Sequence, residues 1–388
     1  MTSWLEDQLR DALTADAEQI RPETLRPAEQ AARTKTIPTR RFVLAVPLAA
    51  ALVVVVIGTV AAIVAGTGGT TPTGPATHTL TGPRFLLIAD NDGVTVHDAR
   101  TGKAASRLEL PPTPERSFRE PGGYLLAGAG DGATFYIAQS VKSRETQVSS
   151  TRFYRARVDE QGKPAELVRD VIPKVIGTTA SSLAVTSDGT RLAYSLDGKV
   201  CGQGKTLRFC PGAQLTVVDL PASRTRTWTT NIAGQIESLS WAADRRTLGL
   251  VVKSEARVLD TTASGTTLGT SQVIAQGKEA TASAINPNGR SMLIGHIQLS
   301  NGRQPHRYTI DEYSVPDGRK LRTLLSRDHD GNEGGRWSLI RYDGTGHHLL
   351  LAGNFDPLSR VDDGRVTPLI RPGSPDALGH RSEIQAAW

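Results

Sequence analysis

Beyond residue 83 the chain repeats one pattern of hydrophobic and polar positions. An apolar stretch leads into a turn that holds Asp or Asn, usually with Gly, and a second apolar stretch follows. This predicts a strand, a tight turn and an antiparallel strand, because Asp, Asn and Gly tolerate the backbone angles of tight hairpins. The five segments are GGYLLAGAGDGATFYIAQ from Gly122, SLAVTSDGTRLAYSL from Ser182, SLSWAADRRTLGLVV from Ser238, ASAINPNGRSMLIGHI from Ala282 and SLIRYDGTGHHLLLAG from Ser338.

Each of these strand pairs is followed by another hairpin, and the turn of this second hairpin also recurs. It occurs six times, once without an upstream strand pair of its own. The spacing of equivalent turns lies at or somewhat above the roughly 40–50 residues of a propeller blade. The six turns are centred on Asp98, Asp159, Asp219, Asp260, Asp317 and Asp363.

The last residues of the chain, Ser382–Trp388, look like the opening strand of a blade and are similar to the strand that ends at Trp241. They are expected to complete the sheet that begins near Phe85, so that Phe85 and Trp388 mark the closure of a ring without an exposed sheet edge. We therefore expect an all-β, six-bladed β-propeller over residues 84–388, closed by strand 382–388. Five or seven blades follow if one hairpin is misjudged, and a β-sandwich is the alternative fold.

Residues 42–66 carry no charge over 25 positions. A helix needs only about 20 apolar residues to cross the hydrocarbon core, so this segment predicts a transmembrane helix. A cleaved signal peptide is the main alternative, but its apolar stretch is usually about 7–15 residues and its leader is short. Arg40 and Arg41 before Phe42 vaguely resemble a twin-arginine signal and equally fit the cytoplasmic flank of a membrane anchor.

Charge on the two sides of this segment predicts its orientation. Five Lys or Arg residues lie between Arg26 and Arg41, whereas none follows the segment before Arg84. Positive charge favours the cytoplasmic side, so residues 1–41 are expected inside the cell and the C-terminal domain outside. Residues 67–83 are rich in Gly, Pro and Thr, which is typical of a solvated linker.

Residues 3–20 show apolar positions at helical spacing. Ser3 and Glu6 fit a capping box, and Pro22 ends the pattern. Such a short helix cannot bury its apolar stripe alone, which favours a cytoplasmic protein partner; a fraying helix without a ligand is the alternative. The stripe consists of Leu5, Leu9, Leu13 and Ile20, with Ala17 between the last two.

The segments SLAVTSDGTRLAYSL and SLSWAADRRTLGLVV resemble the repeat of TolB-like and WD-repeat-like propellers. The match departs in detail, because no WD dipeptide occurs and Pro appears in the turn only at Pro287. With its Ala-, Gly-, Arg- and Thr-rich composition, the chain is similar to membrane-anchored propeller proteins of actinobacteria. The resemblance implies a fold far more than a function.

Composition and charge narrow the partners. The 388 residues carry a formal net charge of +6, without a block of Lys or Arg. This mild, dispersed excess argues against nucleic-acid binding. The 38 Gly and 22 Pro residues favour turns and therefore β structure.

Cys201 and Cys210 are the only cysteines and lie in one loop beyond the predicted anchor. Outside the cytoplasm such a pair favours a disulfide, with two free thiols as the alternative. A zinc site would need more ligands than the neighbourhood supplies. The expected stabilisation from so short a loop is at most about 2–3 kcal/mol.

Other candidate chemistry is sparse. Asp328, Asp330 and Asn332 offer oxygen donors of the kind calcium prefers, but the loop is not an EF-hand, and a solvated turn between blades is the favoured interpretation. His347 and His348 are adjacent, so a strand sends their side chains to opposite faces. We find no catalytic motif and expect no cofactor.

These features favour an extracytoplasmic binding or sensing module without catalytic activity, which signals through residues 3–20. Propellers present loops on two faces and around a central channel, and such surfaces usually bind proteins or small polymers. The alternative is an extracellular hydrolase or lyase that acts on cell-envelope polymers. A passive structural module of the envelope is a third reading.

Overall fold

A computed structural model describes the chain from Gly82 onward. Residues 74–388 form one compact unit, and the described part of it contains β-strands and one short 3-10 turn, η3 (Leu268–Thr270), but no α-helix. The described ranges are 82–90, 93–112, 117–196, 199–201, 208–210, 212–230, 235–275, 279–298, 306–329, 337–353, 357–362, 364–370 and 385–388.

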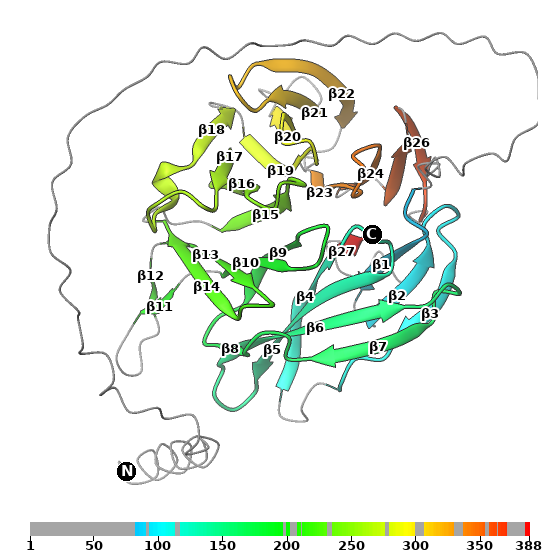
Figure 1. The fold of residues 1–388 in the computed structure, drawn as a ribbon, viewed down its shortest axis with the longest axis vertical. Coiled ribbons are helices and arrows are strands. Elements are labelled where there is room, and N and C mark those ends of the chain that lie inside the picture. The colour runs from blue at the N-terminus through cyan, green and yellow to red at the C-terminus, as the bar shows by residue number, and fades with distance from the viewer. Residues whose placement is uncertain are drawn as a thin grey trace, which may run out of the picture. The chain divides into compact units, whose positions relative to one another are not determined.

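Six four-stranded antiparallel sheets are arranged around a common centre (Figure 1), which confirms the six-bladed propeller. From the inner to the outer strand, blade 1 consists of β27 (Gln385–Ala387), β1 (Phe85–Asp90), β2 (Gly93–Asp98) and β3 (Ala104–Leu108). Blade 2 consists of β4 (Ser117–Gly128), β5 (Thr134–Ser143), β6 (Ser149–Val158) and β7 (Pro164–Arg169). Blade 3 consists of β9 (Ala180–Val185), β10 (Arg191–Leu196), β13 (Gln214–Asp219) and β14 (Arg224–Thr229). Blade 4 consists of β15 (Ile236–Trp241), β16 (Thr247–Val252), β17 (Glu255–Asp260) and β18 (Gln272–Ala275). Blade 5 consists of β19 (Glu279–Ile285), β20 (Ser291–Gln298), β21 (His306–Ser314) and β22 (Lys320–His329). Blade 6 consists of β23 (Trp337–Tyr342), β24 (His348–Gly353), β25 (Ser359–Asp362) and β26 (Arg365–Pro368).

Two additions depart from this plan. The short strand β8 (Val175–Ile176) pairs with β6 at the edge of blade 2. Between the second and third strands of blade 3, β11 (Lys199–Cys201) and β12 (Arg208–Cys210) form a separate two-stranded ribbon.

The first blade is assembled from both ends of the described chain. The inner strand β27 pairs antiparallel with β1, with Ile88 opposite Ala386 and Leu87 opposite Ala387. Figure 1 shows β27 beside β1 near the centre of the ring. This strand pairs the inner edge of β1 and removes a sheet edge that would otherwise be exposed.

The turn between the inner and second strands has the same geometry in blades 2 to 6. The residue at the turn has a positive φ of 57° to 79°, a conformation that glycine adopts without strain. In each blade a backbone N–H at the end of the inner strand donates to a carbonyl at the start of the second strand, at 2.8–3.0 Å. The positive-φ residues are Gly132, Gly189, Arg245, Gly289 and Gly346.

The core lies between the blades. Six clusters of buried apolar side chains each join two neighbouring sheets within the described residues. Trp228 and Trp337 are among the largest fully buried side chains. Burial of both faces of each sheet explains why second strands such as β1, β16 and β24 are mostly apolar rather than alternating.

Several sequence predictions lie outside the described residues, namely the helix at 3–20, the apolar segment 42–66 and nearly all of the linker 67–83. Among the described residues, no helix is both long and apolar enough to span a bilayer. The tail and the anchor therefore stay predictions.

Candidate functional site

A small pocket opens on the ring axis, where the inner strands turn into the second strands. Its volume is about 80 Å³, and all six blades contribute residues to its lining. The described rim consists of small residues, among them Gly130, Ser187, Ala243 and Gly344. The backbone of each inner strand borders this space, because its other edge pairs with the second strand.

One position on the inner strand can be compared in all six blades. In blades 2 to 6 it lies five residues before the positive-φ turn residue, and its partner on the second strand lies nine residues later. In blade 1 the pairing with β1 identifies the equivalent position. Five of the six side chains are small, and the sixth is an arginine in blade 6. They are Ala127, Ala184, Ser240, Ala284, Arg341 and, in blade 1, Ala387.

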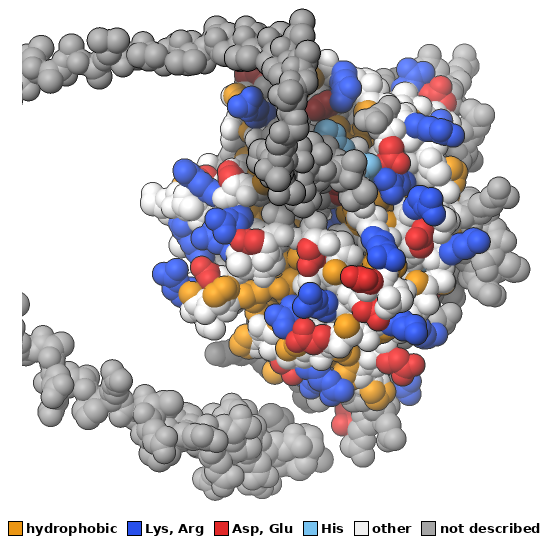
Figure 2. All heavy atoms as spheres, turned by 45° about the vertical axis from the view of Figure 1, so that its right-hand side comes forward, with side chains coloured by type: hydrophobic (Ala, Val, Ile, Leu, Met, Phe, Trp, Pro, Cys, Tyr) orange, Lys and Arg blue, Asp and Glu red, His pale blue; other side chains and the backbone are white. Residues whose placement is uncertain are grey.

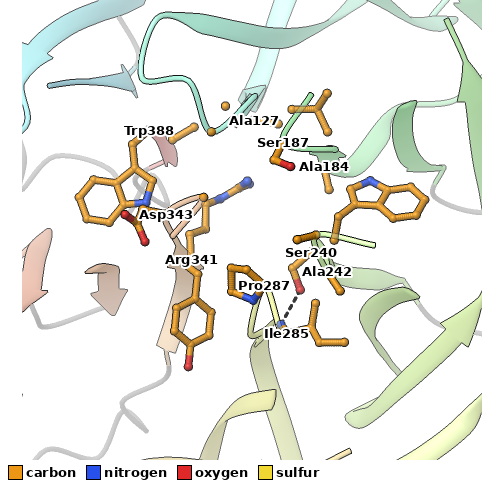
Figure 3. Close-up of a pocket in the computed structure, with 18 of the residues that line it drawn as sticks. Ala127, Ala184, Ser187, Ser240, Ala242, Ile285, Pro287, Arg341, Asp343 and Trp388 are labelled. Atoms are coloured by element: carbon orange, nitrogen blue, oxygen red, sulfur yellow. Dashed lines mark hydrogen bonds between the residues drawn. The ribbon is translucent and has the colours of Figure 1, made fainter. Parts of the chain in front are cut away.

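Arg341 extends from β23 into the axial pocket, and Figure 3 shows its guanidinium in the middle of the lining residues. Its Nη2 donates to the carbonyl oxygen of Leu183 in blade 3, on the opposite side of the ring, at 3.4 Å. Its Nε is inaccessible to solvent and has no hydrogen-bond partner within the described part of the chain. Burial lowers the pKa of Arg341 to about 10, and no neighbouring charge contributes to this shift. The side chain therefore remains a cation at neutral pH.

Two tryptophans that follow this position in their strands line the same pocket. Trp241 and Trp388 are only 9% and 4% exposed, and the indole Nε1 of each has no hydrogen-bond partner among the described residues. Trp241 packs between blades 3 and 4, whereas Trp388 packs between blades 6 and 1. Figure 3 shows Trp388 on one side of the pocket. The backbone of Trp388 lies so close to blade 2 that a Cβ on Gly128 would be 1.6 Å from its carbonyl oxygen.

The carboxylates of the surrounding turns are engaged within those turns. Asp343 is buried, and its carboxylate accepts hydrogen bonds from the Gly346 N–H at 2.8 Å and the Thr345 hydroxyl at 2.7 Å. Asp244 accepts from the backbone N–H and the hydroxyl of Thr247 at 2.8 and 2.6 Å. Burial acts to raise the pKa of Asp244, but these hydrogen bonds prevail and hold it below its usual value.

The aspartates at the turns between the third and fourth strands of the blades are likewise bound within their own turns. Asp98, Asp159, Asp219, Asp260 and Asp317 each accept at least one backbone N–H of their own turn. This confirms that Asp at these five turns has a structural role. Asp363, the sixth, lies outside the described residues.

A larger, more open groove of about 520 Å³ lies between blades 1 and 2. Its lining mixes the basic Arg84 and Arg157 with the acidic Asp131, Asp159, Glu160 and Glu166. Figure 2 likewise shows basic and acidic side chains interspersed over the face in view. This mixture selects no single class of charged ligand.

A charged cluster joins blade 6 to blade 1. His348 Nδ1 and Arg360 Nε both contact the carboxylate Oδ1 of Asp362, the latter at 2.7 Å. Arg360 also donates to the carbonyl oxygen of Ala99 at 3.4 Å and lies 5.8 Å from the ring centre of Trp388. The cluster supports ring closure and was not foreseen in the sequence, because its members meet only after the blades assemble.

The predicted calcium ligands are described only in part. Asp328 lies at the end of β22, where its carboxylate pairs with Arg307 at 2.7 Å. Asp330 and Asn332 lie outside the described residues. No cluster of three or more metal-ligating side chains occurs in the part of the chain that the structure describes.

The remaining predicted residues are placed as follows. Cys201 is opposite Arg208 and Cys210 is opposite Lys199 in the ribbon of β11 and β12, so the two cysteines are two positions out of register. The disulfide stays a prediction. Leu5, Leu9, Leu13 and Ile20 lie outside the described residues.

Comparison with known proteins leaves the family open. No family model matches the chain, and no curated protein sequence matches it. Among solved structures, the β-propeller domain of Cps50 (Swd1) from Myceliophteria thermophila is 12% identical, with 70% of this chain and 90% of that chain covered and a TM-score of 0.38. A structure from a study of two prolyl endopeptidases is also 12% identical, with 63% of this chain and 35% of that chain covered and a TM-score of 0.35. The assignment as a six-bladed β-propeller therefore rests on the strand topology of the chain itself.

Proposed function

We propose that this chain is a membrane-anchored binding protein whose propeller, outside the cytoplasm, recognises a ligand at the axial pocket. The anchor is the uncharged segment 42–66, and the excess of Lys and Arg before it supports the orientation. A propeller that presents a pocket at its axis is compatible with binding or scaffolding.

The observation that carries this proposal is the chemistry of the axial pocket. Within the described residues, the Nε of Arg341 and the indole Nε1 atoms of Trp241 and Trp388 have no acceptor, whereas the carboxylates of the surrounding turns are engaged by their own turns. Unsatisfied donors at a concave site favour recognition of a ligand that brings acceptors. Acid–base catalysis by carboxylates would need groups free to exchange protons with a substrate. We therefore favour a binding role without catalysis.

A photo-crosslinking amino acid at Ser187 of the full-length chain tests this role in intact cells. Ser187 is exposed and lines the pocket. The matched control is Leu321, which is 46% exposed on the outer strand β22. The proposal predicts a specific crosslinked partner from position 187 and none from position 321. Equal labelling from both positions, or none from either, would exclude the axial face as the recognition surface.

The orientation has its own test. In a C201S/C210S background, a single cysteine at Ser187 should react with a membrane-impermeant maleimide added to intact cells, whereas a cysteine at Ala31 should react only after lysis. The reverse pattern, or equal reaction at both sites, would contradict the proposed orientation.

The predicted helix 3–20 extends the proposal to signalling. Its stripe is expected to dock on a cytoplasmic protein, so that ligand binding outside is reported inside. Proximity labelling by a ligase fused at Met1 should identify one reproducible neighbour. The L9E variant should lose that neighbour, whereas Q8E, on another face of the helix, should keep it. Labelling that is unchanged by L9E would remove the signalling role.

A further inference from the structure

We propose that Arg341 is the centre of a binding site for one oxyanion, the carboxylate or phosphate group of an acidic ligand. This inference rests on the proposed function, because it names the chemical class that the axial pocket recognises. Three features of the pocket support it, namely an uncompensated cation, an unused guanidinium donor and a restricted space.

Among the described residues, the cation has no partner of opposite charge. Arg341 is half-buried, and its Nε is inaccessible to solvent. A charge shielded from water is costly unless a counter-charge or hydrogen bonds replace the water. The one described hydrogen bond of Arg341 is the long contact with Leu183, and Asp343, in the same lining, is held within its own turn. An anion placed against the guanidinium would supply the missing charge.

The ring does not need an arginine at this position. Four of the equivalent positions hold alanine and one holds serine, in the same backbone register. Packing of the inner strands is therefore achieved with a small side chain. An arginine that folding does not require, and whose burial is unfavourable, is best explained by a ligand.

The unused guanidinium donor suits an oxyanion. The Nε and Nη groups of a guanidinium form a planar fork that matches carboxylate and phosphate. The Nε of Arg341 is a donor only, so it can be satisfied only by an acceptor. A cationic or purely apolar ligand would leave it unpaired.

The space limits how much of the ligand enters. A volume of about 80 Å³ holds one small polar group rather than a sugar or a peptide segment. The rim residues Gly130 and Gly344 carry no side chains that would keep a larger molecule away from the mouth. The acidic group thus enters the pocket while the rest of the ligand stays on the axial face.

Thermal unfolding of the purified full-length protein in detergent tests this site. Acetate, phosphate and sulfate are titrated separately against chloride at constant ionic strength. Binding at ten times Kd should raise the unfolding temperature by about 2–4 °C. The R341A variant, which places the residue of the equivalent positions here, should fold and bind the preferred anion about 10- to 100-fold more weakly.

Two further variants make the result specific. R341K keeps the charge but loses the planar fork, so its affinity should lie between those of the wild type and R341A. R307A removes an exposed arginine of blade 5 and should bind like the wild type. Equal responses of the wild type and R341A would show an adventitious ion only and would overturn the site.

Combining these variants with the crosslinker at Ser187 separates the two proposals. Loss of the crosslinked partner in R341A supports both. A partner that crosslinks equally well to R341A leaves the recognition surface standing and overturns the oxyanion site. An anion response that depends on Arg341, with no partner crosslinked, supports the site and overturns the proposed function.

Discussion

Arg341 in blade 6 reaches across the ring axis to the backbone carbonyl of Leu183 in blade 3, so one side chain connects opposite sides of the propeller. The contact is long, at 3.4 Å, and it satisfies only one of the guanidinium donors. It holds the side chain over the axis without neutralising its charge.

The first prediction concerns stability without ligand. Since burial lowers the pKa of Arg341 to about 10, the folded state binds this proton less tightly than the unfolded state. Its contribution to stability is therefore unfavourable below pH 10 and is relieved as the pH rises above about 10 toward the higher pKa of the unfolded state. We expect R341A to unfold at the same temperature as the wild type or higher, at pH 7 in chloride buffer. A fall of several degrees would mean that the guanidinium stabilises the ring.

The second prediction concerns the contact between Gly128 and Trp388. The G128A variant places a methyl group where the carbonyl of Trp388 lies, so the closing strand must shift. We expect a loss of at least about 1–3 kcal/mol in unfolding free energy, measured by chemical denaturation. The matched control is G269A, whose Cβ would lie 3.4 Å from the hydroxyl oxygen of Thr267. Equal stability of G128A and G269A would show that Trp388 does not pack against blade 2.

The third prediction concerns acid sensitivity. Asp311 is 1% exposed in β21; burial acts to raise its pKa, but hydrogen bonds from Lys320 and Thr323 prevail and lower it. A carboxyl with a lowered pKa in the folded state contributes stability above its unfolded pKa of about 3.9, and this is lost as the pH falls through the folded value. D311N should therefore unfold at a lower temperature at pH 7 and show a smaller further loss below pH 4.

An exposed acid provides the comparison for this variant. Glu109 is exposed, and E109Q should follow the wild-type dependence of unfolding temperature on pH. If D311N retained the full acid sensitivity of the wild type, Asp311 would not contribute to it.

The fourth prediction concerns Cys201 and Cys210. If the chain is exported, the two thiols should be oxidised, so protein denatured without reductant should resist alkylation and gain two adducts after reduction. Intact-mass analysis of protein recovered from membranes measures this directly. Two adducts without reduction would show free thiols.

The repeats made most of the fold predictable, for a local reason. A turn with Asp and Gly needs only its own residues to form, so equivalent turns such as those at Gly189 and Gly289 mark equivalent blades in the sequence. The positive φ of Arg245 was predictable only from its place in the repeat, because arginine seldom adopts that conformation.

The site was less accessible to sequence reasoning. Arg341 stands in SLIRYDGTG where the aligned segments hold Ala or Ser, and this substitution was a usable signal that motif searches do not detect. The cluster of His348, Asp362 and Arg360 left no such signal, because it depends on contacts between the first and last blades. Asp328 fitted a metal ligand by residue type alone, and its contact with Arg307 on the neighbouring strand became visible only with the fold.

Closure of the ring between β27 and β1 is the central claim, because the axial pocket exists only in a closed ring. Ile88 and Ala386 are directly opposite and buried, so cysteines at both positions in a C201S/C210S background should crosslink on mild oxidation. Cysteines at Ile88 and Ala387 point to opposite faces of the sheet and should not crosslink. Efficient crosslinking of the first pair alone, read by intact mass, is the predicted result. Failure of the first pair, or equal crosslinking of both, would contradict the closed propeller.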